Sequence, residues 1–434
     1  MRKPHLLYTA WGFPPSRAGG VYRALATVNA FAEAGWDVTV ITVPRELWLL
    51  STGVDTALEA QLAEQVRVIR VDPHVANFEN DLASWSWARA RHPELWKAAT
   101  LWRDMLRFPE PNYGRWRPIL EKLAVEIHRE RAVDLAIGTA NPHVDFIPGW
   151  HLNRRFGVRH VMDYRDAWQL DVFSGQKLIT AIPAVGRWES RLMGSATEVW
   201  FVNEAIRRWH AQEHPTHADK MRVVANGYEE YGVPLAVPVR DRGEQPLVFG
   251  YVGTITDKVP LNELIEGWGF ARERGGLLQN ARLVLRGYLG HFGTINPALQ
   301  HALERGKTIG VSYEGPVSKT EIAEAYAGFD ALVLALGTGR YVTSGKVYEY
   351  AATGLPVISV HDPDNAATEV MRESPVWTPV RALDPESIAD SLVATAEVAA
   401  AQTPSSRREA QEWATQYERR RQLAPRIEAL TPTG

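Results

Sequence analysis

The chain has 434 residues, more than the roughly 250 to 300 at which a single hydrophobic core stops growing, so we expect two domains. Apolar residues make up 45% and charged residues 23%, which is typical of folded globular proteins and excludes disordered, collagenous and coiled-coil chains. The formal charge of -3 gives no overall attraction for nucleic acid or an anionic membrane, so either partner would need a local patch.

Cysteine is absent, which excludes disulfides, thiolate zinc sites, redox dithiols and cysteine nucleophiles. The N-terminal MRKPHLLYTAWGFPP holds an apolar run too short for the core of a signal peptide. No stretch approaches the roughly 18 apolar residues of a membrane-spanning helix. We therefore expect a cytoplasmic protein.

Short β-rich runs alternate with helical patterns, as in βα units on parallel sheets. The first half contains two clear helical patterns, 21–34 and 117–130, and Gly35 ends the first. The strands predicted for this half are 5–10, 37–43, 66–71, 134–139, 159–164 and 198–202.

A second series of strand patterns begins at residue 247. Between the two series, residues 231–246 carry several Gly and Pro without periodicity, so we place an interdomain linker there. The strands predicted for the second half are 247–253, 281–287, 311–315, 330–336, 355–360 and 375–380. The sequence thus predicts an α/β protein with two doubly wound domains, residues 1–232 and 245–403, facing a central cleft at the carboxyl ends of their strands.

Two segments stand apart from this pattern. Residues 76–116 form a Trp-rich, mixed-charge insertion, which either packs as a helical excursion on the N-terminal domain or forms an acceptor-binding or membrane-touching surface. Residues 404–434 contain a helical pattern, 405–430, with apolar side chains along one side. We expect this helix to span both domains and pack back across the N-terminal one.

Glycines follow the first predicted strand, in the stretch FPPSRAGG that opens a helix. Gly19 and Gly20 allow a ligand to approach the backbone, and free N–H groups at the helix start suit a phosphate or a sugar hydroxyl. A tight turn without a ligand is the alternative.

A second motif, TSGKVYEYAATGLPVI, runs from Thr343 to Ile358. Its Ser-Gly-Lys turn enters a helix, and Glu349 follows Gly345 by about one turn, so one nucleotide could contact both through its pyrophosphate and its ribose diol. The motif is not a Walker A loop, because Val347 stands where Ser or Thr would bind magnesium. ATPase activity is therefore disfavoured.

SGKVYEYAATGLPVIS resembles the nucleotide-sugar motif of the retaining GT-B glycosyltransferases, especially glycosyltransferase family 4. Four further stretches are similar to parts of that family, in order and spacing, over most of residues 5–360. They are PPSRAGGVYRALATVNAFAEAGWDVTVIT, VMDYRDAW, VVANGYEE and GYVGTITDK. The resemblance implies the GT-B fold of two Rossmann-like domains and transfer of a sugar from a nucleoside diphosphate sugar.

The resemblance also implies roles for individual residues. Glu349 would bind the ribose diol, and Lys258 would neutralise the leaving diphosphate as a catalytic cation. The sequence departs from the family pattern at two places, where Tyr341 replaces a glutamate and Thr254 replaces an arginine. The donor-binding residues expected are Gly19, Gly20, Thr254, Tyr341, Ser344, Gly345, Lys346 and Glu349.

The acceptor side lies in VMDYRDAW and its surroundings, where the histidine of many family members is missing. We expect Arg165 and Asp166 to be catalytic, Arg165 by orienting phosphate or acceptor, and His143 and Asp163 to line the acceptor side. A buried ion pair between Arg165 and Asp166 is the structural alternative.

The expected function is thus a hexosyltransferase-like enzyme acting with retention and with neither metal nor cofactor. Its donor would be a nucleoside diphosphate sugar, with the UDP type favoured, and its acceptor a small molecule, a glycan or a lipid-linked sugar. No nucleic-acid partner is expected, and membrane contact stays open. The alternatives are a non-catalytic nucleotide-sugar-binding homologue, suggested by Tyr341 and Thr254, and a GT-B sugar-nucleotide epimerase.

Three further motifs have simpler interpretations. His210-Ala-Gln-Glu213-His214 matches the spacing of some zinc peptidases, but Pro215 follows at once, so we interpret it as a solvated helix end. Asp362-Pro-Asp364 is interpreted as a turn. GYLGHFG, residues 287–293, has the wrong glycine spacing for a dinucleotide fingerprint and is interpreted as a loop that could contact the donor.

Overall fold

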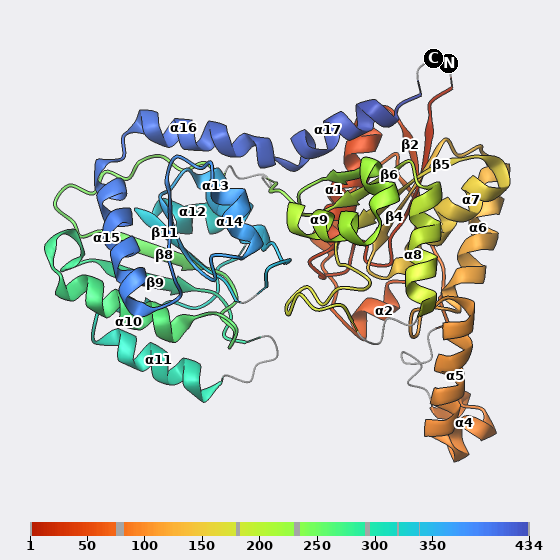
Figure 1. Ribbon diagram of the computed structural model, residues 1–434, viewed down its shortest axis with the longest axis horizontal. Helices are drawn as coiled ribbons and strands as arrows, with labels where there is room; N and C mark the ends of the chain where they lie inside the picture. The colour runs from red at the N-terminus through yellow and green to blue at the C-terminus, as the bar shows by residue number, and fades with distance from the viewer. Residues whose placement is uncertain are drawn as a thin grey trace. The chain divides into compact units, whose positions relative to one another are not determined.

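The computed structural model describes residues 2–74, 82–178, 183–229, 235–290, 296–318, 321–337 and 339–432. The chain folds into two compact units. Unit 1 comprises Met1–Val172, Gln176–Ala225 and Gln422–Gly434, and unit 2 comprises Phe173–Gly175 and Asn226–Arg421. Each unit contains one parallel sheet with helices on both faces (Figure 1).

Unit 1 has a seven-stranded sheet in the order β3-β2-β1-β4-β5-β6-β7. The chain moves outward from β1 to β3 and then returns to β4 on the other side of β1, so the strand order reverses between β1 and β4. Ligands bind at such switch points, outside the carboxyl ends of the strands. The strands are β1 His5–Thr9, β2 Asp37–Thr42, β3 Arg67–Arg70, β4 Leu135–Ala140, β5 Arg159–Tyr164, β6 Glu198–Phe201 and β7 Met221–Val223.

Helices of unit 1 cover both faces of this sheet. Leu6 and Tyr8 of β1 pack in one core with Val28 and Phe31 of α1. On the other face α6 packs against α7, and α7 packs against β4 and β5. The helices are α1 Val21–Glu33, α2 Glu46–Leu49, α3 Thr56–Glu59, α4 Trp87–Arg91, α5 Pro93–Arg107, α6 Trp116–Glu130, α7 Ile147–Phe156, α8 Pro183–Ser195 and α9 Glu204–Glu213.

Unit 2 has a six-stranded sheet in the order β10-β9-β8-β11-β12-β13, with its switch point between β8 and β11. In Figure 1, α10, α11 and α15 lie on one face of this sheet and α13 and α14 on the other. The strands are β8 Val248–Val252, β9 Arg282–Arg286, β10 Val311–Tyr313, β11 Ala331–Ala335, β12 Val357–Val360 and β13 Trp377–Pro379. The helices are α10 Leu261–Glu273, α11 Pro297–Lys307, α12 Ile322–Ala327, α13 Gly345–Thr353, α14 Ala366–Met371, α15 Pro385–Ala401 and α16 Pro404–Ala414.

The predicted fold class is confirmed, and each of the twelve predicted strands has a counterpart in the structure. The central strands β1, β4, β11 and β12 are buried along their whole length, as expected of parallel strands covered by helices on both faces, whereas the edge strands β3, β10 and β13 are partly exposed. The sequence analysis missed β7, which has only three residues and follows a short 3-10 helix. Part of the predicted linker, residues 231–234, lies outside the described residues.

The prediction of one continuous helix at 405–430 is wrong. Helix α16 ends at Ala414, a 3-10 turn follows, and α17 (Arg419–Leu430) starts anew. Between them the backbone N–H of Tyr228 donates to Tyr417 O, and the N–H of Arg419 donates to Tyr228 O, so an extended pairing replaces helical hydrogen bonds. Helix α16 packs on α13 in unit 2, whereas Leu423, Ile427 and Leu430 belong to the core of unit 1.

The Trp-rich insertion contains α4 and α5, which extend away from the rest of unit 1 (Figure 1). Its first residues, 76–81, lie outside the described residues. Trp116, at the other end, is completely buried. The insertion therefore combines a tryptophan of the domain core with a projecting helical arm.

A buried carboxyl group links the two segments that follow β1 and β4. Asp145 is completely buried and accepts hydrogen bonds from the N–H of Trp11 at 2.6 Å and from Trp116 Nε1 at 3.3 Å. Burial raises the pKa of Asp145 to about 8. The carboxyl is therefore protonated in the folded protein over a pH range in which it would be ionised in the unfolded chain.

Ile427→Ala should lower the free energy of unfolding by about 2 to 5 kcal/mol, because it leaves a cavity where α17 enters the core of unit 1. Chemical denaturation measures this loss. Val398→Ala, at a 37% exposed position of α15, is the control and should change stability by less than about 0.5 kcal/mol. Equal effects of the two variants would show that α17 does not contribute to the core.

Asp145→Asn should flatten the pH dependence of stability. The pKa of Asp145 in the folded protein is raised to about 8, so its protonated carboxyl contributes fully to the free energy of unfolding at acid pH. This contribution is lost as the pH rises toward 8, by up to about 1.4 kcal/mol per pH unit. Unfolding free energies of the two proteins should therefore diverge in favour of the variant between about pH 5 and 8. Exposed Asp364→Asn is the control, and parallel curves for wild type and Asp145→Asn would contradict the assignment.

Candidate functional site

The loops after β1, β4 and β5 meet at the carboxyl edge of the unit 1 sheet. Gly20 ends the loop after β1 and caps α1, and Arg165 directly follows β5. A side chain at Gly20 would displace the guanidinium of Arg165, because its Cβ would lie 1.2 Å from Arg165 Nη1. A Cβ at Gly19 would meet nothing within 4 Å. The second glycine of the predicted loop therefore makes room for the guanidinium.

Arg165 is held by backbone carbonyls. Its Nε donates to Ala140 O at 2.9 Å and its Nη2 to Asn141 O at 3.0 Å. Within the part of the chain that is described, Arg165 has no carboxylate at ion-pair distance, so the alternative of an Arg165–Asp166 pair is not what the structure contains. Asp166 itself is exposed. This half-buried cation is available to an anion at the sheet edge.

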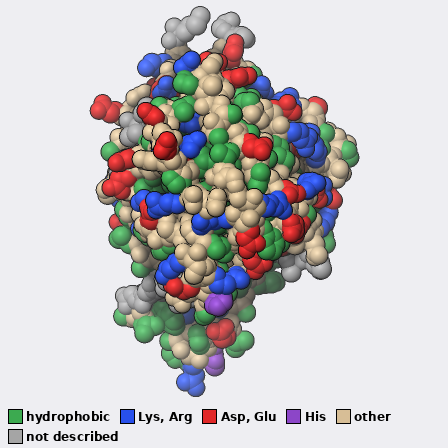
Figure 2. Space-filling view, turned by 90° about the vertical axis from the view of Figure 1, so that its left-hand side faces the viewer, with side chains coloured by type: hydrophobic (Ala, Val, Ile, Leu, Met, Phe, Trp, Pro, Cys, Tyr) green, Lys and Arg blue, Asp and Glu red, His purple; other side chains and the backbone are tan. Residues whose placement is uncertain are grey.

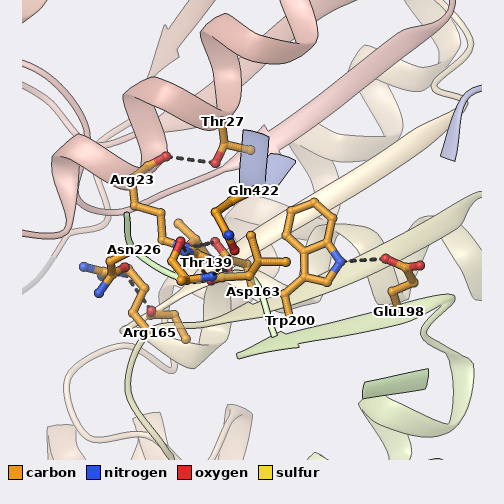
Figure 3. A network of polar contacts seen from close by, with 12 residues as sticks. Arg23, Thr27, Thr139, Asp163, Arg165, Glu198, Trp200, Asn226 and Gln422 are labelled. Carbon is orange, nitrogen blue, oxygen red and sulfur yellow. Dashed lines mark hydrogen bonds and ion pairs between the residues drawn. The ribbon is translucent and has the colours of Figure 1, made fainter. Parts of the chain in front are cut away.

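Asp163, predicted on the acceptor side, lies inside the unit. Its carboxylate is completely buried and forms an ion pair with Arg23 of α1, with Nη2 to Oδ1 at 2.6 Å. Thr139 Oγ1 donates to the same carboxylate, and Arg23 also donates to the carbonyls of Val224 and Ala225 (Figure 3). Protein donors thus surround Asp163, which favours a positioning role for it: it ties α1 to β5 beneath the Gly20–Arg165 contact.

His143 is also buried, at the start of the 3-10 turn that follows β4. Its ring stacks on Trp168 at 4.7 Å, and its Nε2 lies 3.3 Å from Asp166 O. Glu110, which the sequence analysis did not single out, accepts from the backbone N–H groups of His143 and Val144 at 2.9 Å and lies 3.1 Å from His143 Nδ1. The histidine therefore supports the loop that carries Arg165 and Asp166.

The interpretation of residues 210–214 as a solvated helix end is wrong for His210, which is completely buried. His210 Nε2 lies 3.5 Å and His214 Nε2 3.2 Å from the carboxylate of Glu189. Tyr164 Oη and Gln169 Nε2 donate to the same carboxylate at 2.8 and 2.5 Å. These partners hold the pKa of Glu189 well below its usual range although burial opposes this. Glu189 thus fixes both ends of the stretch 164–169.

In unit 2 the corresponding edge is formed by the ends of β8, β9 and β11. Gly253 directly follows β8 with φ of 149°, and Gly287 directly follows β9 with φ of 145°. A Cβ at Gly287 would lie 1.9 Å from Gly253 O, and one at Gly253 would lie 2.0 Å from Lys346 Nζ. Only glycines let these two turns and the lysine come together.

Lys346 belongs to the first turn of α13, and its side chain folds back over the end of β8. Its Nζ lies 2.8 Å from Tyr251 Oη and 4.5 Å from the centroid of that ring. Among the described residues, no carboxylate lies at ion-pair distance from Nζ. Burial lowers the pKa of Lys346 to about 8, against a smaller opposing effect of Glu349. A partly buried ammonium group without a carboxylate partner is a candidate anion-binding group.

Helix α13 begins as the motif predicts. Ser344 caps it by accepting from the N–H of Lys346 at 3.4 Å, and Gly354 ends it in the left-handed conformation. Gly345 is exposed at the helix start, and Glu349 is half-buried one turn later. The Gly345 N–H at this helix start and the Lys346 ammonium lie at the same switch point of the sheet.

The other predicted donor residues lie on neighbouring loops of unit 2. Lys258 is exposed, with Nζ 4.2 Å from the Phe173 ring, and its backbone abuts Gly337 after β11. Thr254 O accepts from Tyr251 Oη at 2.9 Å, and Tyr341 is half-buried beside Gly175. Thr254 and Lys258 thus lie on the loop after β8, and Tyr341 lies on the loop after β11.

Two of the simpler motifs can be placed. Asp362 Oδ1 accepts from the N–H of Asp364 at 2.9 Å, which confirms a turn before α14. Of the stretch 287–293, residues 291–293 lie outside the described residues. The sequence analysis missed Tyr251, whose role depends on a lysine 95 residues away and which no local motif reveals.

No family model and no curated protein sequence matches the chain. Solved structures are similar over nearly its whole length. A glycosyltransferase from Rickettsia africae ESF-5 is 13% identical, with a TM-score of 0.65, over 99% of this chain and 98% of that one. HepE from Anabaena, in complex with UDP, is 15% identical, with a TM-score of 0.63, over 98% of this chain and 100% of that one.

A Listeria monocytogenes protein named for UDP-N-acetylglucosamine 2-epimerase is also similar. It is 10% identical, with a TM-score of 0.54, over 99% of this chain and 96% of that one. At such identities the similarity establishes the fold. With its two parallel, doubly wound sheets, the chain has the GT-B fold of two Rossmann-like domains.

Proposed function

We propose that the protein is a glycosyltransferase that transfers a sugar from a nucleoside diphosphate sugar to an acceptor. The observation that carries this proposal is the partly buried Lys346 ammonium, held over Gly253 at the start of α13 with no carboxylate of the described residues at ion-pair distance. A diphosphate would supply the missing negative charge, and the Gly345 N–H at the helix start would bind one of its oxygens. HepE is described in complexes with UDP and with UDP-glucose, which supports a UDP-type donor.

The remaining donor contacts follow from the resemblance to glycosyltransferase family 4 and from the spacing along α13. Glu349, one turn after Gly345, would accept hydrogen bonds from the ribose diol. Lys258 is exposed and would approach the leaving diphosphate. Ser344 would order the first turn of α13 by capping it.

The proposed sugar transfer depends on stabilising the charges that develop in its transition state. As the sugar leaves, positive charge grows on its anomeric carbon and negative charge on the diphosphate, and preorganised cations lower the energy of that state. Lys346 and Lys258 would serve the diphosphate, and Arg165 would orient a phosphate or the acceptor. Front-face attack assisted by the leaving phosphate would retain the anomeric configuration without a protein nucleophile or a metal ion.

UDP binding should weaken as pH rises above about 8. In the free protein Lys346 loses its proton near that pH, whereas a bound diphosphate raises its pKa, so binding at higher pH must take up a proton. Affinity should be full below pH 8 and should fall by up to about tenfold per pH unit above it. Calorimetry in buffers of different ionisation enthalpy would detect proton uptake at about pH 9 and little at pH 7.

Lys346→Met should weaken UDP binding by roughly 1 to 3 kcal/mol and abolish this pH dependence. Lys122→Met, at a 79% exposed lysine of α6, is the matched control and should bind as wild type does. If the Lys346 variant is folded and keeps both the affinity and the pH profile of wild type, the donor site proposed at α13 is refuted.

Gly20→Ala should lower turnover about as much as Arg165→Ala, because the new Cβ displaces the guanidinium. Gly20 has φ of -70°, which alanine adopts without strain, so stability should change little. The double variant should be no worse than Arg165→Ala, since the two residues act through one contact. Gly19→Ala, which meets nothing within 4 Å, is the control.

Turnover is measured by release of nucleoside diphosphate with an acceptor present and EDTA added. Additive losses in the double variant would show that Gly20 and Arg165 act separately. Activity that returns only when Mg²⁺ or Mn²⁺ is supplied would contradict metal independence.

A sugar-nucleotide epimerase is the second candidate, favoured by the similarity to the Listeria protein. The two reactions differ in their need for an acceptor. An epimerase converts its sugar nucleotide alone, whereas a transferase consumes the donor only as the acceptor is glycosylated. NMR of a sugar nucleotide incubated with the protein alone separates them: a new sugar nucleotide would support the epimerase.

A further inference from the structure

Residues 82–107 form the projecting part of unit 1, which we call the α4–α5 arm. One side of this arm is held by packing contacts. The guanidinium of Arg89 lies between the rings of Trp85 and Trp96, 4.0 and 4.6 Å from their centroids. Asp104, almost completely buried, pairs with Arg115 at 3.3 Å. These contacts use two of the tryptophans of the insertion to hold α4 against α5, so the arm is an ordered element with a defined outer face.

That outer face is apolar. Leu95, Trp102 and Leu106 of α5 follow one another at seven and four residues, which places them on one side of the helix, and Ala99 lies between them. Their side chains are 70%, 64% and 67% exposed. On α4, Trp87 is 75% exposed. Single exposed apolar residues are common, but a stripe at helical spacing that includes tryptophan marks an interaction surface.

The arm is also basic. It contains five Lys and Arg residues against two Asp and Glu, although the whole chain has 48 against 51. One of the two acids is Asp104, whose charge is already paired. Arg103 and Arg107 of α5 are exposed close to the apolar stripe. In Figure 2 hydrophobic side chains lie beside Lys and Arg at the lower end of the view, where the arm projects.

We propose that the α4–α5 arm docks on the surface of a lipid bilayer that contains anionic headgroups. An amphipathic helix with Leu and Trp on one face and basic residues beside it lies in the plane of a membrane interface, with its apolar face in the acyl boundary. Tryptophan favours this boundary, and anionic headgroups attract the Arg side chains. None of the helices in the described part of the chain could cross a membrane.

A second copy of the chain fits the arm less well. In a two-fold symmetric dimer the same surface would face itself, and the excess of Arg and Lys on each arm would repel the other. Anionic headgroups complement both the charge and the apolar stripe. The docking is independent of the proposed donor site, so it is measured on the full-length protein without nucleotide.

Flotation with vesicles tests the proposal. The protein should bind vesicles of phosphatidylcholine and phosphatidylglycerol in equal parts at least tenfold more tightly than vesicles of phosphatidylcholine alone. Arg103→Gln with Arg107→Gln should reduce binding to the anionic vesicles about 30-fold, at roughly 1 kcal/mol per charge. High salt should reduce it as well, because it screens the headgroups. Trp102→Ser with Leu106→Ser should reduce binding about tenfold or more.

Control variants in unit 2 remove the same kinds of side chain from positions outside the α4–α5 arm. Leu277→Ser, at a 44% exposed leucine of unit 2, and the pair Arg282→Gln with Arg408→Gln should leave vesicle binding unchanged. All variants change exposed side chains, and circular dichroism and melting temperature confirm that each is folded. Blue-shifted tryptophan emission on adding anionic vesicles, lost in Trp102→Ser, would place that ring in the bilayer interface.

Two results would overturn the proposal. One is unchanged vesicle binding in the Trp102 and Leu106 double variant. The other is a wild-type protein that ignores anionic vesicles but forms a dimer by light scattering, with the dimer lost in that same variant. The second result would assign the stripe to a contact between copies of the chain.

Discussion

In each unit a cationic side chain occupies the space that a glycine leaves at the carboxyl edge of the sheet. Arg165 lies against Gly20 in unit 1, and Lys346 lies against Gly253 in unit 2. Both glycines follow the strand at a switch point, where two neighbouring loops diverge and leave backbone groups accessible. A β-carbon at either position would push the cation away, so the chemistry proposed for each edge depends on these missing side chains.

Cations at a sheet edge need rigid support, and buried polar groups provide it. In unit 1 the Arg23–Asp163 pair fixes α1 to β5, Glu110 fixes the turn after β4, and Glu189 holds the stretch that follows Tyr164. Breaking a buried pair by removing one partner is strongly destabilising, because the other charge stays unpaired. The buried carboxylates of Asp163 and Glu110 are bound to other donors, and the guanidinium of Arg165 is held by backbone carbonyls.

The tryptophans of the Trp-rich insertion lie in two different environments. Trp116 is part of the core, and Trp85 and Trp96 hold an arginine between their rings, so these side chains stabilise the fold. Trp87 and Trp102 are exposed beside basic residues. The sequence analysis left packing and an interaction surface as alternatives for the whole segment, whereas in the structure some of its tryptophans are packed and others are exposed.

The sequence by itself determined the fold class, the positions of twelve strands along the chain and the start of α13, because these depend on local patterns: buried apolar runs, helical spacing, and a Ser cap followed by a closing Gly. Tertiary structure decided which polar side chains are accessible. Asp163 meets a partner 140 residues away, Lys346 meets Tyr251 across 95 residues, and His210 turns inward to Glu189. It also broke the C-terminal helix, since backbone pairing with Tyr228 competes with helical hydrogen bonds at residues 417–419. Such outcomes depend on contacts between segments far apart in the chain, which no local pattern encodes.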